Sequence, residues 1–183
     1  MTRIVAGAAG GRRLRVPPRG TRPTSERVRE AVFSALEAGD ELAGARVLDL
    51  YAGSGALGLE ALSRGAADAY FIEADRHAAE VLRGNVSSLD LGGTVRHGKV
   101  EAVVGVRAAA AFDLVLADPP YMVTNADLNG VLGSLAAGGW VAPTGLVVLE
   151  RAVRDGAVDW PAQFRALRTK NYGDTAVHWG EFG

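Results

Sequence analysis

From residue 45 to residue 150 the sequence alternates between short apolar runs and helix-like segments, and this alternation restricts the possible folds most. The expected strands span residues 46–51, 68–73, 95–97, 112–117 and 145–150. The expected helices between them span residues 56–64, 76–89, 100–109 and 126–137. Successive β-α-β units build a parallel sheet with helices on both faces.

The carboxyl-terminal residues add a different element. Two further runs, residues 164–171 and 175–179, are joined at Gly173-Asp174, which is a strong hairpin signal. A terminal hairpin places one antiparallel strand beside the parallel ones. We therefore expect an α/β, Rossmann-like fold with a mostly parallel seven-stranded sheet and one antiparallel strand.

The amino-terminal residues are predicted to form a small extension. Residues 3–6 and 12–16 alternate enough to pair as a hairpin, with glycines between them. Thr24 and Ser25 can cap a helix that begins near Glu26 and ends at Gly39. We expect two units: a hairpin-plus-helix extension at residues 1–39 and a main domain at residues 40–183.

Charge is distributed unevenly along the 183 residues. Residues 1–29 carry eight arginines against Glu26 alone, a net charge of +7, whereas the rest of the chain carries −8. An arginine-rich arm on an acidic body is typical of a protein that contacts nucleic acid locally, although a solvated tail is the simpler alternative. The sequence has no cysteine, which excludes disulfides and cysteine-ligated zinc and favours a cytoplasmic location. No segment reaches transmembrane length, so we expect no membrane partner.

A glycine-rich turn follows the first predicted strand of the main domain. Gly53-x-Gly55-x-x-Gly58 with Glu73 twenty residues after Gly53 fits a dinucleotide fingerprint, in which the carboxylate binds ribose hydroxyls. Asp49 lies four residues before Gly53, where it could face the cationic amino group of a methionine moiety. This favours S-adenosylmethionine over NAD, with a purely structural turn as the remaining alternative.

The segment Asp118-Pro-Pro-Tyr121, at the end of the strand predicted at 112–117, supplies the second half of a transfer site. An exocyclic amine on a base is a poor nucleophile because its lone pair is delocalised. The Asp118 carboxylate and the Pro119 carbonyl can accept its two N–H groups, and the prolines hold the turn rigid. Tyr121 can stack on the base. The alternative is a turn that only ends a strand.

These residues resemble one family along nearly the whole chain. Asp49-Leu-Tyr-Ala-Gly-Ser-Gly-Ala-Leu-Gly58 and the residues up to Ala66 are similar to the cofactor loop of the RsmD family, bacterial methyltransferases of 16S ribosomal RNA. Asp-Pro-Pro-Tyr is shared by many amino-group methyltransferases. The amino-terminal segments at residues 3–7, 11–14 and 22–30 narrow the resemblance to this family.

The resemblance implies a class I methyltransferase fold, S-adenosylmethionine as methyl donor, and transfer to the N2 amine of guanine 966 in 16S ribosomal RNA. It implies that the substrate is the small ribosomal subunit, with ribosomal proteins near the target loop as partners. The implied catalytic residues are Asp118, Pro119, Pro120 and Tyr121. The implied cofactor residues are Asp49, Tyr51, Gly53, Ser54, Gly55, Glu73, Ala74, Lys99, Val100 and Asp118. The resemblance places Arg22 and Thr24 near the RNA-binding mouth, and the charge pattern adds other arginines of the arm. The expected RNA-binding residues are Arg3, Arg12, Arg13, Arg15, Arg19, Arg22, Thr24 and Arg27.

One residue departs from the family pattern. Where the family usually has Asp or Asn to accept from the adenine amine, this chain has Lys99, which cannot accept a hydrogen bond. Backbone groups or Glu101 are then the candidates for reading adenine. Three other functions remain open: an amino-group methyltransferase acting on DNA adenine or a protein glutamine, an NAD-linked oxidoreductase, and a catalytically idle RNA-binding module.

Overall fold

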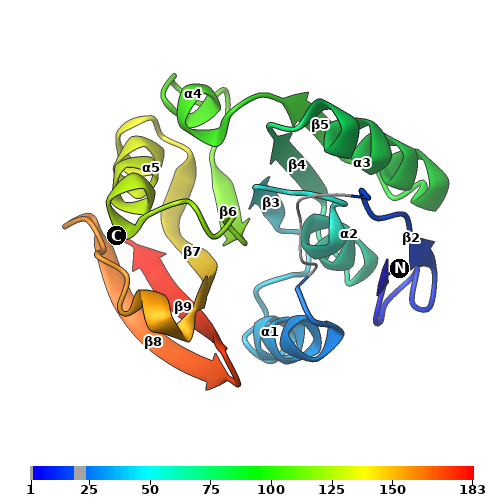
Figure 1. Cartoon of the computed structure of the whole chain (residues 1–183), viewed down its shortest axis with the longest axis horizontal. Helices are drawn as coiled ribbons and strands as arrows, with labels where there is room; N and C mark the ends of the chain where they lie inside the picture. Colours follow the sequence, from blue (N-terminus) through cyan, green and yellow to red (C-terminus); the bar gives the residue numbers. More distant parts are fainter. Residues whose placement is uncertain (1, 19–23) are drawn as a thin grey trace.

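The structure is a computed structural model that describes residues 2–18 and 24–183. Its centre is a seven-stranded sheet with the order β5-β4-β3-β6-β7-β9-β8 (Figure 1). The strands span β3 Arg46–Leu50, β4 Asp68–Glu73, β5 Thr94–His97, β6 Phe112–Ala117, β7 Val141–Ala152, β8 Phe164–Tyr172 and β9 Thr175–Phe182. Only β9 runs against its neighbours, because it pairs antiparallel with both β7 and β8. The predicted α/β fold with one antiparallel hairpin strand is confirmed.

Within the described residues, five α-helices cover the two faces of this sheet. They are α1 Glu26–Ala38, α2 Ala56–Ser63, α3 Arg76–Leu89, α4 Val100–Val104 and α5 Asn125–Ala137. Buried residues of α1, α2 and α3 form one apolar cluster with alternate strand residues such as Val47, Phe71 and Leu116. Buried residues of α4 and α5 form a second cluster with strand residues of the opposite face, such as Leu48 and Val115. The period of two along each strand produces this division.

The amino-terminal hairpin consists of β1 Thr2–Arg3 and β2 Arg13–Leu14, which pair antiparallel. Ile4 and Leu14 are buried in the cluster that contains α1, α2 and α3. Figure 1 shows the hairpin beside α2 and α3 at one end of the sheet. The predicted hairpin and helix are therefore present, and they share a core with the strands of the main domain. The proposed division at residue 39 stays a prediction.

A buried cluster of charged residues, Arg29, Glu60 and Arg64, connects the hairpin and α1 to α2. Arg29 of α1 is fully buried, and its Nε lies 3.2 Å from Glu60 Oε1. The Glu60 carboxylate also accepts from the backbone amides of Val5 and Ala6 and from Arg64 Nε. Buried charges of this kind are costly unless every partner is present. Arg29 is therefore a structural residue, although it belongs by sequence to the arginine-rich arm.

The predicted boundaries differ from the structure at several element ends. The hairpin strands are shorter than predicted, and β7 and β9 extend to Ala152 and Phe182 rather than to residues 150 and 179. β7 begins at Val141 rather than at residue 145, because Phe112 pairs with Val141 before an irregularity in the β6–β7 register. α4 ends at Val104, well short of residue 109. Tyr51 lies outside β3, because its φ of 56° belongs to the left-handed region and turns the chain out of the sheet.

Candidate active site

Three strand ends bring the predicted cofactor and transfer segments together. In the parallel ladder, Leu50 at the end of β3 is the partner of Ile72 in β4 and of Ala117 in β6. Adjacent strands lie about 4.8 Å apart. The turn that begins at Tyr51 and the segment that begins at Asp118 therefore leave the sheet side by side, at the carboxyl edge where open α/β sheets bind ligands.

The cofactor turn is held by hydrogen bonds from its own backbone. The Gly53 amide donates to Glu73 Oε2 at 2.7 Å, and the Asp75 amide donates to Glu73 Oε1 at 3.0 Å. Gly53 and Gly55 have φ of 55° and 87°, where side chains are disfavoured. Glu73 thus closes the turn and still has lone pairs for a ribose, since each carboxylate oxygen accepts more than one hydrogen bond.

Asp49 lies beneath the turn and is almost completely buried. Its Oδ2 accepts from the Gly58 amide at 2.9 Å, and within the described part of the chain its buried Oδ1 has no hydrogen-bond partner. Burial raises the pKa of Asp49 well above its usual range, opposed by the Gly58 amide, and the charges of Glu73 and Asp118 raise it further. A buried acceptor without a partner is costly and indicates a ligand group that donates to it.

Asn85 of α3 is a site residue that the sequence reasoning missed. Its amide nitrogen donates to the Ser54 carbonyl at 2.8 Å and to the Arg15 carbonyl at 2.9 Å. Its carbonyl oxygen accepts from the Arg15 amide at 2.9 Å. One buried side chain thus joins the cofactor turn to the basic hairpin. The only sequence signal for this role was that Asn85 is a polar residue on the apolar stripe of the helix predicted at residues 76–89.

The transfer segment has fewer internal contacts. Asp118 Oδ2 accepts from the Thr24 hydroxyl at 2.9 Å. Burial raises the pKa of Asp118 to about 6, while the Thr24 hydrogen bond and the charge of Arg151 lower it. Thr24 was predicted as an RNA-binding residue, and the structure places it against the predicted catalytic carboxylate.

The residues after Asp118 move progressively into solvent. Pro119 is buried and Pro120 is exposed. The Tyr121 side chain is 83% exposed, which leaves its ring available for stacking. Arg151 of β7, buried and not predicted, donates to the Val123 carbonyl at 2.9 Å and fixes the point where the loop returns toward α5.

A cavity of about 530 Å³ lies between α4 and α5, beside the cofactor turn. Tyr51 and Glu101 line it, together with Val123 and Asp127. Burial raises the pKa of Tyr51 to about 12, so its hydroxyl stays neutral. The three remaining predicted cofactor residues surround the start of α4: Ala74 is exposed, Lys99 is exposed at the helix N-cap, and Val100 is buried.

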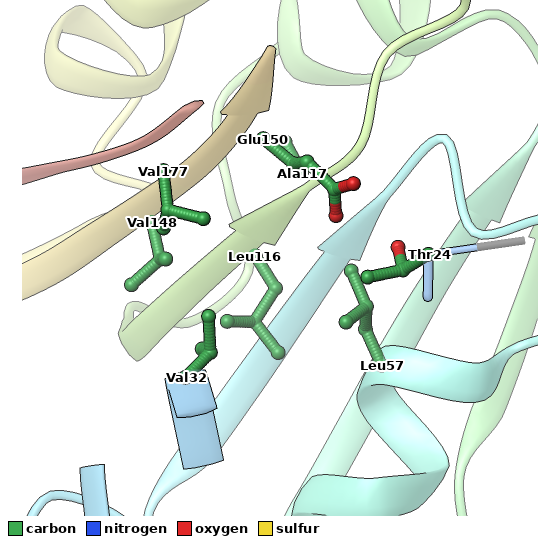
Figure 2. A pocket seen from close by; sticks show the side chains of 8 residues that line it. All are labelled: Thr24, Val32, Leu57, Leu116, Ala117, Val148, Glu150 and Val177. Atoms are coloured by element: carbon green, nitrogen blue, oxygen red, sulfur yellow. The ribbon is translucent and has the colours of Figure 1, made fainter. Parts of the chain in front are cut away.

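A second, much smaller cavity of about 10 Å³ lies on the opposite face of β6. Thr24, Leu116 and Val148 line it, with Glu150 of β7. Figure 2 shows the Glu150 carboxylate and the Thr24 hydroxyl directed toward the same space near Ala117. Sequence reasoning missed Glu150, because a charged residue at the end of a strand resembles an ordinary strand terminus.

The predicted RNA-binding arginines have different environments. Arg3 is exposed and pairs with Glu26 at 2.7 Å, and Arg12 donates to the Ser88 carbonyl. Arg13, Arg15 and Arg27 are exposed. Arg19 and Arg22 were predicted on residues that lie outside the described ranges. Among residues 2–18 and 24–183 no acidic or histidine cluster could hold a metal ion, and no helix has the length and apolarity needed to cross a membrane.

Comparison with known proteins connects this geometry to a family. The family described as conserved hypothetical protein 95 matches residues 2–181. The ribosomal RNA small subunit methyltransferase D of Escherichia coli strain K12 is 37% identical over 175 residues, which is 95% of this chain and 86% of the relative. The chain belongs to the RsmD family. The resemblance predicted from the sequence is confirmed.

Other relatives of this RsmD family member agree with the assignment. The enzyme of the same name from Haemophilus influenzae is 31% identical over 93% of this chain and 89% of its own length. The solved structure of the Escherichia coli protein yhhF superimposes with a TM-score of 0.87 at 34% identity, covering 98% of this chain and 97% of that chain. The predicted class I methyltransferase fold is confirmed.

Proposed function

We propose that this RsmD family member transfers a methyl group from S-adenosylmethionine to the N2 amine of a guanine in 16S ribosomal RNA. The observation that supports it most is the convergence of Asp49, Glu73 and Asp118 at the ends of three adjacent strands. These carboxylates match a cationic donor on one side and an amine on the other. The name of the RsmD relatives, ribosomal RNA small subunit methyltransferase D, supports small-subunit ribosomal RNA as the acceptor.

The cofactor turn supplies contacts suited to each part of the donor. Glu73 is placed to accept from the ribose hydroxyls while it closes the turn at Gly53. Asp49 Oδ1 is placed to accept from the methionine ammonium, and a cation there would restore the ionised carboxylate that burial disfavours. S-adenosylmethionine supplies the methyl electrophile: the new N–C bond forms as the C–S bond breaks, and that electron pair stays on sulfur.

Glu101 is our candidate for reading the adenine amine. It lines the 530 Å³ cavity with Tyr51. A carboxylate accepts from an exocyclic amine, whereas the exposed Lys99 at the start of α4 cannot accept. This assigns to Glu101 the role that an Asp or Asn near position 99 has in the family pattern. Val100 and Ala74 would then supply apolar contacts to the ring.

On the acceptor side, Asp118 holds and activates the amine. Its carboxylate accepts one N2–H, and the Pro119 carbonyl accepts the other. These two hydrogen bonds favour a pyramidal amine nitrogen whose lone pair faces the methyl group. The Thr24 hydroxyl fixes the carboxylate through Oδ2, which leaves Oδ1 for the base. After transfer the extra proton passes from N2 to Asp118 or to water. Tyr121 stacks on the base, and Arg13, Arg15 and Arg27 meet phosphates.

Labelled donor tests this proposal against its rivals. The purified chain would be offered small-subunit particles that lack the modification, total DNA, and a protein fraction. We expect label in the particles alone, and mass mapping should find it as N2-methylguanine. Label in DNA adenine or in a protein glutamine would show a different acceptor, and binding of NAD in place of S-adenosylmethionine would identify an oxidoreductase. Binding of the particle without any transfer would identify an idle RNA-binding module.

A further inference from the structure

Glu150 is a second carboxylate placed next to Asp118. Leu149 of β7 is the ladder partner of Ala117 at the end of the neighbouring parallel strand β6. Glu150 is the next residue of β7, and Asp118 is the first residue after β6. Neighbouring strands are about 4.8 Å apart. The backbones of Glu150 and Asp118 therefore lie side by side at the edge of the sheet where the proposed transfer takes place.

Both side chains also belong to the same face of the sheet. Leu116 and Val148 pack in the cluster that contains α1, α2 and α3, and the period of two assigns Asp118 and Glu150 to that face. The hydrogen bond from Thr24 to Asp118 agrees with this assignment. Figure 2 shows the Glu150 carboxylate on the same side, directed into the small cavity that Thr24 also lines.

The surroundings of Glu150 favour recognition by hydrogen bonds. The cavity walls include the apolar side chains of Val32, Leu57, Leu116 and Val177. Its volume of about 10 Å³ is room for about one water-sized polar group, so the ring of a base would stay outside it. A site whose polar groups are paired by the correct base leaves those groups unpaired when another base binds, and the site then discriminates between the two bases.

We propose that Glu150 is a specificity-determining residue that accepts the N1–H of the target guanine while Asp118 holds the adjacent N2 amine. Guanine presents these two donors side by side, and an ionised carboxylate only accepts. A base with an acceptor at N1, such as adenine or 2-aminopurine, would place its lone pair against the Glu150 carboxylate. A carboxylate has about four acceptor positions, so this contact is compatible with others inside the protein. The inference rests on the proposed guanine-N2 activity.

The test compares guanine with 2-aminopurine, which keeps the 2-amino group but has no N1–H. Small-subunit RNA carrying either base at the target position would be assembled into particles and assayed with the wild-type chain, with Glu150→Gln, and with Glu41→Gln as an exposed control. We expect the wild type and the control to prefer guanine by at least about tenfold. Glu150→Gln should lower transfer to guanine by about tenfold to a hundredfold and shift the preference toward 2-aminopurine, because its amide donates to N1.

A purely structural role for Glu150 would lower transfer to both bases equally, and an unchanged guanine to 2-aminopurine ratio would overturn the proposal. Should Glu150→Gln fail to fold, which thermal unfolding would reveal, the wild-type ratio decides: a ratio near one overturns the proposal and a clear preference for guanine supports it. Absence of transfer to any guanine by the wild type would contradict the proposed function itself. If only the proposal about Glu150 is wrong, the wild type still methylates guanine, so the two outcomes can be distinguished.

Discussion

The cofactor half and the transfer half of the site are adjacent in the sheet but are held in different ways. In the cofactor half, Glu73 accepts two backbone amides, and Asn85 joins the Ser54 carbonyl to the hairpin. In the transfer half, Asp118 has one side-chain hydrogen bond within residues 2–18 and 24–183, from Thr24, and Tyr121 is 83% exposed. The first half is preorganised by the fold, whereas the second is completed by its substrate.

Because the two halves are held differently, substitutions in them should have different effects on stability and on catalysis. Residues of the cofactor half carry both folding and donor binding, so their substitution should affect unfolding and affinity together. Residues of the transfer half carry little of the fold, so their substitution should affect turnover alone.

Asp118→Asn should have the largest effect on turnover. An amide cannot accept the proton of the amine and presents a donor to it, so we expect transfer to fall by about a thousandfold. Donor affinity, measured by calorimetry, should change little because Asp118 belongs to the transfer half. Asp159→Asn, at an exposed position, is the control. Turnover close to wild type would remove Asp118 from the chemistry.

Glu73→Ala should weaken both donor binding and the fold. Loss of a charged hydrogen-bonding group typically costs about 1.5–3 kcal/mol, so we expect donor affinity to fall by tenfold or more. The melting temperature should fall as well, since the Gly53 and Asp75 amides lose their acceptor. Equal donor affinity in the variant and the wild type would exclude Glu73 from the cofactor site.

Asn85→Ala tests whether the fold alone preorganises the cofactor turn. It removes three hydrogen bonds of a buried side chain, and we expect the free energy of unfolding to fall by about 1–3 kcal/mol. Donor affinity should fall with it, measured by calorimetry beside thermal unfolding. Ser87→Ala, at an exposed position on the same helix, should change neither. Donor affinity unaffected by Asn85→Ala would show that the turn needs no support from α3.

The pH dependence of transfer should report Asp118. Its pKa is raised to about 6, so below that pH the carboxyl is protonated and cannot accept from both the base and Thr24. We expect kcat/KM to rise as pH increases through about 6, since this parameter reports groups of the free enzyme. Thr24→Val removes the hydrogen bond that lowers this pKa and should move the rise to higher pH. A flat profile between about pH 5 and 8 would contradict the assignment.

Arg13→Ala should have the smallest effect, confined to RNA affinity and its salt dependence. Each phosphate contact with single-stranded RNA contributes about −0.7 to the slope of log K against log salt, so the slope should become shallower by roughly that amount. Melting temperature should stay unchanged, because Arg13 is exposed. Arg29→Met is the contrasting variant, since its buried pair with Glu60 predicts a loss of stability. An identical slope for Arg13→Ala would exclude this residue as a phosphate contact.

The sequence predicted the fold well because its signals were local. The period-two strands and the Gly173-Asp174 hairpin specify the sheet, and the glycines at 53 and 55 adopt the positive φ that the turn requires. The family could also be predicted from local signals, because the motifs that carry the resemblance are contiguous in the sequence. Tyr51 was placed in a strand because an aromatic residue favours strands, and only the left-handed φ of the turn overrides that preference.

What the sequence did not predict depends on contacts between distant segments. Asn85 lies 70 residues from Arg15, and Glu60 lies 54 residues from Ala6, so no spacing rule connects them. Arg29 was counted in the net charge of the arginine-rich segment, and charge counting does not show that its side chain is buried. Glu150 approaches Asp118 only through the pairing of β6 with β7. These tertiary contacts join the hairpin to the site and surround the catalytic carboxylate.

The central claim is that one crevice holds the donor beside Gly53 and the target base beside Asp118. A crystal structure with a bisubstrate analogue, in which the adenosyl group is linked to guanine N2 through the transferred carbon, tests it most directly. We expect the ribose at Glu73 and the guanine edge between Asp118 and Glu150 in the same molecule. An adenosyl group bound at Glu73 with its guanine directed away from Asp118 would contradict the account.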